Sequence, residues 1–335
     1  MPTATHILVA NPTARSGRTA ERLQQALQAL GAQGIPAQLL PTLPGGETVR
    51  AVREAIQQNN PQCIISMGGD GTFREVTQGL LESERQESIT LAMLPAGTAN
   101  NHGRSFGLDA TDAALEKNVA IIAKGRETRL DVGRVEMTGA AGAIRATFVD
   151  SVGFGIGARV IAERNVQRRR MEGKRRLQQI YRDQRVYTVA TLQMLWSAST
   201  LDDFGVTVIA DGQSRTYPRL TELLVKGTRV YAGRWVIDRT SKHDDGLFEV
   251  LAFPDNRYWV AKGLVDVVGA DALDATLAAI GISLPSPFRA ARLSFQFQVP
   301  EGLPKPAVQV DGEEFPGAEK VTIEVLARAV RLIVP

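Results

Sequence analysis

The sequence of 335 residues is poor in cysteine and histidine. Its single cysteine, Cys63, has no partner for an intramolecular disulfide, which excludes a disulfide scaffold. The three histidines, His6, His102 and His243, lack the spacing of metal ligands, so we assign no metal to them. The net charge of +3 is too small to indicate a nucleic-acid-binding protein.

Long apolar runs are also absent. No stretch of about 18 uncharged apolar residues occurs, which predicts that nothing in the chain spans a membrane. The first six residues lack the basic and apolar segments of a signal peptide. We therefore expect a cytoplasmic protein, and any membrane contact would be peripheral, at the inner membrane surface.

The signals that are present divide the chain into two parts. Strand and helix signals alternate over the first ~125 residues, as in an open, mostly parallel sheet. Beyond them, strand signals dominate, with two helical stretches at 158–197 and 258–280. We predict an α/β domain over 1–127 and a β-rich, sandwich-like domain over 128–335, whose last strand can return to the first domain.

The most specific motif is Gly68-Gly69-Asp70-Gly71-Thr72, between an apolar strand and a helix expected from Phe73. Glycines let backbone N–H groups approach an anion, and the helix N-terminus adds positive potential there. Thr72, near the expected N-cap, can serve both the helix and a phosphate. Asp70 would repel a phosphate, so it either holds a cation against the phosphates or orients a water or hydroxyl. A strained turn that binds nothing is the alternative.

Two further loops follow predicted strands of the same sheet. One runs from Asn11 to Gly17, and the other, Leu94 to Asn100, offers Gly97, Thr98 and Asn100 to an anion or a sugar. Each alone would be an ordinary turn. Because the carboxyl ends of parallel strands line one crevice, the three loops together predict a ligand site.

These motifs resemble those of the diacylglycerol kinase catalytic-domain family, which includes the sphingosine kinases and the bacterial lipid kinases. The shared patterns are Asn-Pro-x-x-x-x-Gly, Gly-Gly-Asp-Gly-Thr and Pro-x-Gly-Thr-x-Asn, and downstream the segments Phe148 to Gly155, Asp244 to Val250 and Val310 to Glu313. The resemblance spans nearly the whole chain. It implies a fold like that of the NAD and diacylglycerol kinases. It also implies an ATP- and Mg²⁺-dependent kinase whose acceptor is a hydroxyl of a diacylglycerol- or sphingosine-like lipid.

The resemblance also implies site residues. Thr42, Gly68 to Phe73 and Thr98 fall where the family contacts ATP. The predicted ATP-binding set is Asn11, Thr42, Gly68, Gly69, Asp70, Gly71, Thr72, Phe73, Gly97, Thr98 and Asn100. Asp245, with backbone groups near Lys242 and Leu247, falls at a structural Mg²⁺ site. Glu313 falls at the proposed proton acceptor, with Asp311 beside it, and Asp70 completes the catalytic set.

Phosphoryl transfer needs positioning, charge neutralisation and a carboxylate near the attacking hydroxyl. Asp311 and Glu313 flank a glycine turn, so both can project from one hairpin toward a cleft, and the sequence leaves open which is the base. Asp-Gly is also an ordinary hairpin dipeptide, as at Asp211-Gly212, so a structural role for Asp311 stays open. Asp245 is likewise an ordinary turn carboxylate unless the resemblance holds.

Three positions depart from the family pattern. Asn101-His102-Gly103 stands where the family usually has Asp-Phe-Ala, Asp150 replaces the usual Asn, and Lys226-Gly227 lacks the usual Asn-Gly. They leave the phosphate loops intact, and we expect them near the substrate, with His102 a candidate contact to nucleotide or substrate. The runner-up interpretations are an NAD kinase and a catalytically inactive nucleotide- or lipid-binding protein.

The segment Arg164 to Arg185 is strongly basic, with nine Lys or Arg residues against Glu172 and Asp183. An apolar side at helical spacing follows it, which suits contact with an anionic membrane. A solvated helix packed on the β-rich domain is the alternative.

Overall fold

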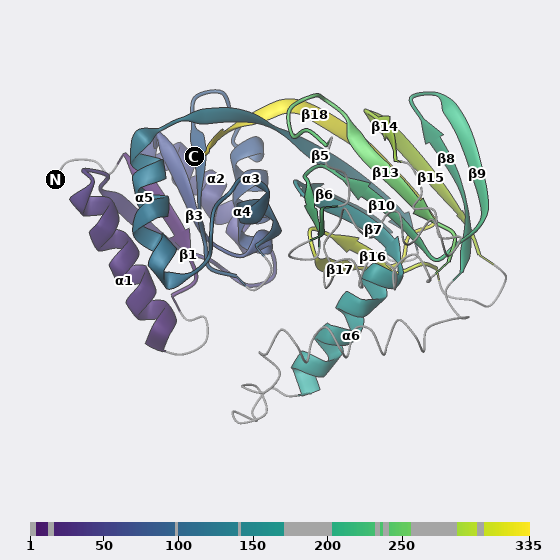
Figure 1. Ribbon diagram of the computed structural model, residues 1–335, viewed down its shortest axis with the longest axis horizontal. Helices are drawn as coiled ribbons and strands as arrows, with labels where there is room; N and C mark the ends of the chain where they lie inside the picture. Colours follow the sequence, from purple (N-terminus) through teal and green to yellow (C-terminus); the bar gives the residue numbers. More distant parts are fainter. Residues whose placement is uncertain are drawn as a thin grey trace, which may run out of the picture.

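The computed structural model describes residues 5–12, 17–97, 100–139, 142–170, 203–231, 235–236, 241–255, 287–299 and 305–335. They form an α/β half and a β-rich half, joined by two long strands (Figure 1). The predicted fold class is therefore confirmed. No helix in these ranges is long and apolar enough to cross a membrane.

The N-terminal half is built on four parallel strands. They are β1 (His6–Ala10), β2 (Ala37–Pro41), β3 (Cys63–Gly68) and β4 (Thr90–Pro95), in the order β2-β1-β3-β4. The helical elements are α1 (Gly17–Ala32), α2 (Glu47–Asn59), α3 (Asp70–Glu82), α4 (Asn101–Ser105), a 3-10 turn (Asp112–Ala114) and α5 (Leu115–Lys124). Helices α1 and α5 lie on one side of the sheet, and α2 and α3 on the other (Figure 1). The central strands are therefore buried on both faces, as their continuous apolar runs predict.

The C-terminal half is a sandwich of two antiparallel layers. One layer has the order β14-β13-β10-β7-β16-β17, and the other belongs to the large sheet. The strands are β5 (Glu127–Gly139), β6 (Gly142–Phe148), β7 (Ser151–Gly155), β8 (Phe204–Ala210), β9 (Gln213–Leu220), β10 (Glu222–Lys226), β11 (Val230–Tyr231), β12 (Trp235–Val236), β13 (Phe248–Phe253), β14 (Phe288–Ala290), β15 (Arg292–Gln298), β16 (Val308–Val310), β17 (Glu313–Phe315) and β18 (Lys320–Ile333). Phenylalanines of both layers, such as Phe154 and Phe295, meet in the core between them.

Strands β5 and β18 pair along most of their length and run through both halves (Figure 1). The end of β18 also pairs in parallel with β4, and its beginning pairs with β15. The last strand thus lies in the sheet of the first half. Because β5 itself runs from one half into the other, the boundary at 127/128 stays a prediction.

Two expected elements were wrong in detail. The helix expected from Phe73 begins at Asp70, because Gly69 is extended (φ −94°, ψ −171°) and turns the chain immediately before it. Thr72 is therefore in the first turn rather than near the N-cap.

The single strand expected over 143–152 is divided between β6 and β7, which belong to different sheets. The chain breaks there because the N–H groups of Val149, Asp150 and Ser151 all donate to the carboxylate of Asp311. The first predicted helical stretch is present as α6 (Ile156–Arg170), which extends from the end of β7 (Figure 1). Its remainder, with most of the basic segment, and the stretch at 258–280 lie outside the described residues.

Candidate functional site

The candidate site lies where the four parallel strands end. Ala10 at the end of β1 is in register with Pro41 of β2 and Met67 of β3, and Gly68 is in register with Pro95 of β4. The predicted residues Asn11, Thr42, Gly68 and Gly97 therefore follow neighbouring strand ends along one edge. The expectation that these loops follow strands of one parallel sheet, at its carboxyl edge, is confirmed.

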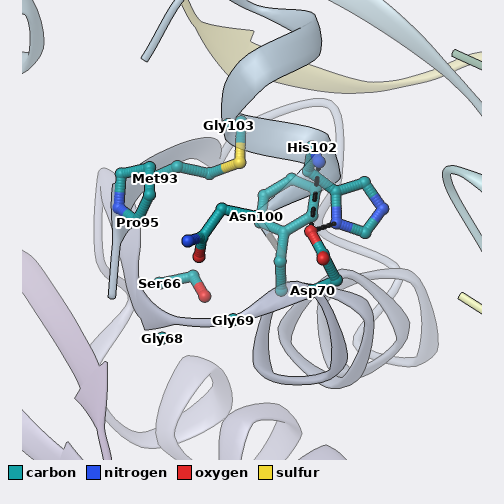
Figure 2. A pocket seen from close by; sticks show the side chains of 10 residues that line it. Ser66, Gly68, Gly69, Asp70, Met93, Pro95, Asn100, His102 and Gly103 are labelled. Carbon is teal, nitrogen blue, oxygen red and sulfur yellow. Dashed lines mark hydrogen bonds and ion pairs between the residues drawn. The ribbon is translucent and has the colours of Figure 1, made fainter. Parts of the chain in front are cut away.

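The glycines of these loops allow the loops to touch each other. A Cβ on Gly69 would lie 3.2 Å from the Cα of Gly97, and a Cβ on Gly97 would collide with the backbone of Gly69. A Cβ on Gly68 would lie 2.5 Å from Oγ1 of Thr72. Contacts within the protein thus explain why residues 68, 69 and 97 are glycines. That their backbone N–H groups approach an anion stays a prediction. The small pocket between the two loops is shown in Figure 2.

Asp70 organises the start of α4. Its Oδ2 accepts the N–H of Asn101 and its Oδ1 accepts the N–H of His102, both at 3.1 Å. The Nδ1 of His102 lies 2.9 Å from Oδ1 of Asp70 (Figure 2). Burial alone would raise the pKa of Asp70, but the charge of His102 and these hydrogen bonds hold it below its usual value. Asp70 thus points toward α4, with neither oxygen free of a protein partner.

His102 lies between two carboxylates. Its Nε2 is 3.6 Å from Oδ2 of Asp311, opposite the contact to Asp70, and its side chain is 1% exposed. Neither ring nitrogen has a well-aligned acceptor, so both contacts are ion pairs rather than ideal hydrogen bonds. Burial alone would lower the pKa of His102, but Asp70 and Asp311 together raise it to about 10. The imidazole is therefore protonated at neutral pH.

Asp311 is buried in the turn between β16 and β17. Its Oδ1 accepts the N–H groups of Asp150 and Ser151, and its Oδ2 accepts that of Val149, each at 2.8 Å. The carboxylate has no exposed surface. A substrate hydroxyl could reach it only by displacing these partners, so its place in the structure is that of a backbone anchor.

Glu313, two residues later, is accessible. Its side chain is 44% exposed, and Oε2 is ion-paired with Nη2 of Arg74 on α3. Its Oε1 lies so close to Gly71 that a Cβ there would collide with it. An exposed carboxylate from the C-terminal half is therefore brought onto the glycine-rich loop.

The three departures from the family pattern converge beside the site. Asp150 accepts hydrogen bonds from Asn101 Nδ2 at 3.2 Å and from Thr228 Oγ1 at 2.5 Å, and it forms an ion pair with Lys226. Lys226 and Asp150 are both 2% exposed. A buried charge needs a partner of opposite sign, and each of these residues provides it for the other. The altered positions are therefore one connected network that includes the helix carrying His102.

Other predicted ATP contacts are placed differently. Phe73 is in the hydrophobic core, with its ring centroid 5.2 Å from that of His102. Asn100 is buried and folds back on its own loop, accepting from the N–H of Gly97 at 2.8 Å and donating to its carbonyl at 2.7 Å. Both side chains are used inside the protein, and both residues also line the small pocket, so their contact with ATP stays a prediction. Thr98 lies outside the described residues.

The predicted metal residues lie at another point of the junction between the halves. Asp245 Oδ1 accepts the N–H of Leu247 at 3.2 Å, and its Oδ2 is 3.9 Å from Arg289. Burial raises the pKa of the neighbouring Asp131, and the negative charges of Asp245 and Asp244 raise it further. In the part of the chain that is described, no three His, Cys, Asp or Glu side chains are arranged to hold a metal ion. Carboxylate oxygens such as those of Asp244 and Asp245 are ligands that Mg²⁺ prefers, so a structural ion held by Asp245 and backbone groups near Lys242 and Leu247 stays a prediction.

Sequence reasoning did not find the partners that hold the site together. Arg74 follows Asp70 by four residues on α3, so both lie on one side of that helix, a spacing that could have been noticed. The links from His102 and Lys226 to residues far along the chain have no comparable local signal. Their only signal was the departure from the family pattern.

Comparison with known proteins gives a consistent result. Residues 5–135 match the family model described as diacylglycerol kinase catalytic domain. A "Probable lipid kinase YegS-like" of Klebsiella pneumoniae is 34% identical over 148 residues, which cover 44% of this chain and 45% of the relative. The "Probable lipid kinase YegS" of Escherichia fergusonii is 30% identical over 143 residues, or 43% of this chain and 44% of the relative. The matched segment thus spans less than half the length of these relatives.

Among solved structures, a diacylglycerol kinase from Bacillus anthracis has a TM-score of 0.67 and 20% identity. The match covers 100% of this chain and 98% of that one. At this identity the likeness establishes the fold, and it does so over both halves.

Proposed function

Residues 5–135 match the model of the diacylglycerol kinase catalytic domain, and from this match we propose that the protein is an ATP-dependent lipid kinase. It transfers the γ-phosphoryl group of ATP to a hydroxyl of a diacylglycerol- or sphingosine-like lipid. The observation that carries the proposal is the contact of Glu313 with the glycine-rich loop at Gly71.

Glu313 is the proton acceptor in this proposal. It is exposed, whereas Asp311 is buried and holds three backbone N–H groups. The acceptor hydroxyl gives its proton to Glu313, its oxygen bonds to the γ-phosphorus, and the bond from that phosphorus to the bridging oxygen breaks to release ADP. Arg74 holds Glu313 in place before transfer.

The loops at the strand ends bind the nucleotide phosphates. The N–H groups at the start of α3 and the positive end of its helix dipole favour negative charge near Gly68 to Thr72. Asn11 and Thr42, which follow the ends of the neighbouring strands β1 and β2, also contact the nucleotide. Mg²⁺ would neutralise charge at the site, and Asp245 would hold a structural ion.

The acceptor is a lipid in this proposal because the family match and the curated relatives are those of lipid kinases. Which hydroxyl is used depends on the residues beside Glu313, where the network around Asp150 departs from the family pattern. Peripheral contact of residues 164–185 with an anionic membrane is part of the proposal.

The test is turnover by the purified full chain with ATP and Mg²⁺. Diacylglycerol, sphingosine and NAD are offered separately, and products are identified by mass spectrometry. We expect a phosphorylated lipid and no NADP. Phosphorylation of NAD alone would make the protein an NAD kinase. Nucleotide binding without any product would make it a binding protein.

Asp70→Asn keeps the size of the side chain and removes its charge, and it is the variant that we expect to be inactive. A neutral side chain cannot hold both the α4 amides and the charged His102, so we expect loss of turnover. Circular dichroism at the assay temperature checks that the variant is folded. Activity within about tenfold of the parent, only ~1.4 kcal/mol of barrier, would contradict the role given to Asp70.

A further inference from the structure

Helix α4 links the two halves of the molecule through polar side chains. His102 contacts Asp70 of α3 and Asp311 of the β16–β17 turn. Asn101 donates to Asp150 at 3.2 Å. Ser105 completes the link, because its Oγ donates to Thr228 Oγ1 and accepts from the N–H of Val230, both at 3.2 Å. A helix of five residues thus touches three separate segments of the β-rich half.

His102 occupies the most buried of these links. At 1% exposure, with Phe73 packed at its ring, it offers almost no surface to nucleotide or substrate. Burying a charge is costly unless it is paired, and here each ring nitrogen faces a different carboxylate. These two carboxylates come from opposite sides of the junction. The arrangement therefore fixes the two sides relative to each other.

The segment that contains Asp70 and the segment that contains Asp311 meet a second time, at the surface. Asp70 is followed in the chain by Gly71, which contacts Glu313, and Glu313 lies two residues beyond Asp311. The buried link through His102 and the exposed contact of Gly71 with Glu313 are thus parallel connections. Without the buried link, the ion pair with Arg74 would be the side-chain contact that still ties Glu313 to α3.

We propose that His102 is a positioning residue for the proposed phosphoryl transfer. By joining Asp70 to Asp311 it sets the position of Glu313 over the loop Gly68 to Thr72. This inference rests on the proposed lipid kinase function. It gives His102 a role without substrate contact, in place of the contact considered from the sequence.

The experiment compares the parent with His102→Gln, His102→Phe and the control His6→Gln. Gln keeps a hydrogen-bonding group but cannot carry the charge, and Phe removes both. His6, by contrast, is only half-buried and lies at the amino end of β1, at the opposite edge of the sheet. We expect kcat to fall by about 10- to 100-fold in both His102 variants, because a small displacement of the base is enough for such a loss.

Comparing the change in kcat with the change in KM distinguishes a positioning role of His102 from a role in nucleotide binding. We expect KM for ATP to change by less than about threefold, because Glu313 acts in the transition state. His6→Gln should match the parent in both constants. A His102 variant with unchanged kcat, or with KM raised in proportion to the loss, would overturn the proposal. If His102→Phe does not fold, His102→Gln decides.

Hydrogen exchange without nucleotide or lipid provides the second readout. Amides of Val149 to Ser151 and of β17 should exchange faster in the His102 variants, and those of the distant β8–β9 hairpin should not change. Unchanged exchange at Val149 to Ser151 would overturn the proposal. If the parent has no kinase activity, the proposed function fails by that fact alone. The exchange comparison then still decides whether His102 holds the turn.

Discussion

The molecule contains two Asp-Gly hairpins that are nearly identical as turns. Asp211 and Gly212 join β8 to β9 with φ values of 46° and 85°, and Asp311 and Gly312 join β16 to β17 with 47° and 79°. Both carboxylates accept backbone N–H groups of another segment. The turn type predicted from the dipeptide is therefore confirmed in both.

Their surroundings differ. Asp211 is exposed and binds the N–H groups of Ala291 and Arg292 in its own layer. Asp311 is buried, binds the break between β6 and β7, and faces the charged His102 of the other half. The same Asp-Gly sequence thus forms an ordinary hairpin turn at residues 211–212. At residues 311–312 it forms a turn whose carboxylate is an anchor at the junction between the two halves. The difference lies in the partners and not in the turn.

The largest effect should come from Glu313→Gln, which gives the second hairpin the sequence of the first, Asp-Gly-Gln. Glu313→Gln removes the proposed base, so we expect kcat to fall by about 10²–10⁴-fold while ATP affinity changes little. Single-turnover kinetics and nucleotide titration measure the two quantities. The matched control, Gln213→Glu, should leave both unchanged. Weakened ATP binding with an intact kcat would instead place Glu313 with the nucleotide.

The next largest effect concerns the two aspartates. Asp311→Asn leaves the buried charge of His102 without one partner, which costs about 3–5 kcal/mol for a buried pair. Asp211→Asn affects only exposed hydrogen bonds, and about 1 kcal/mol or less is expected. Urea unfolding of both variants measures the difference. Equal destabilisation would mean that burial and His102 add nothing to Asp311.

The pH dependence of stability should distinguish the two hairpins further. The pKa of His102 is raised from 6.5 to about 10 in the folded protein. Its contribution is therefore complete below pH 6.5 and is lost as the pH rises toward 10.

The measurement is the difference in unfolding free energy between the parent and His102→Gln. It should shrink with rising pH over this window, by at most about 1.4 kcal/mol per pH unit. The difference between the parent and Asp211→Asn should stay constant over the same window. A parent-to-His102→Gln difference that does not depend on pH would show that His102 is not charged in the folded state.

The comparison also explains how far the sequence could lead. Local signals were sufficient for the alternating first half, for the β-rich second half and for both hairpin turns. The loop set at the strand ends followed from the rule that parallel strands share a carboxyl edge, and the register bears it out. Each of these inferences depends on residues close together in the chain or on a general property of sheets.

What the sequence could not provide were contacts between distant segments. The division of 143–152 into two strands depends on Asp311, about 160 residues later. The choice between Asp311 and Glu313 as the proposed base depends on burial, which the shared hairpin does not reveal. Phe73 and Asn100 belong to conspicuous motifs, and yet their side chains are used for packing and for closing a loop.

The smallest effect should be shared by the two hairpins. Gly212 and Gly312 both have positive φ, and a Cβ on either would meet nothing within 4 Å. The cost of Gly→Ala at each position is therefore only that of the left-handed backbone conformation, about 1 kcal/mol. Urea unfolding of Gly212→Ala and Gly312→Ala should give values that agree within the error of the method. A much larger loss for Gly312→Ala would show that the turn is itself strained by its anchor, and the two hairpins would then differ as turns as well as in their partners.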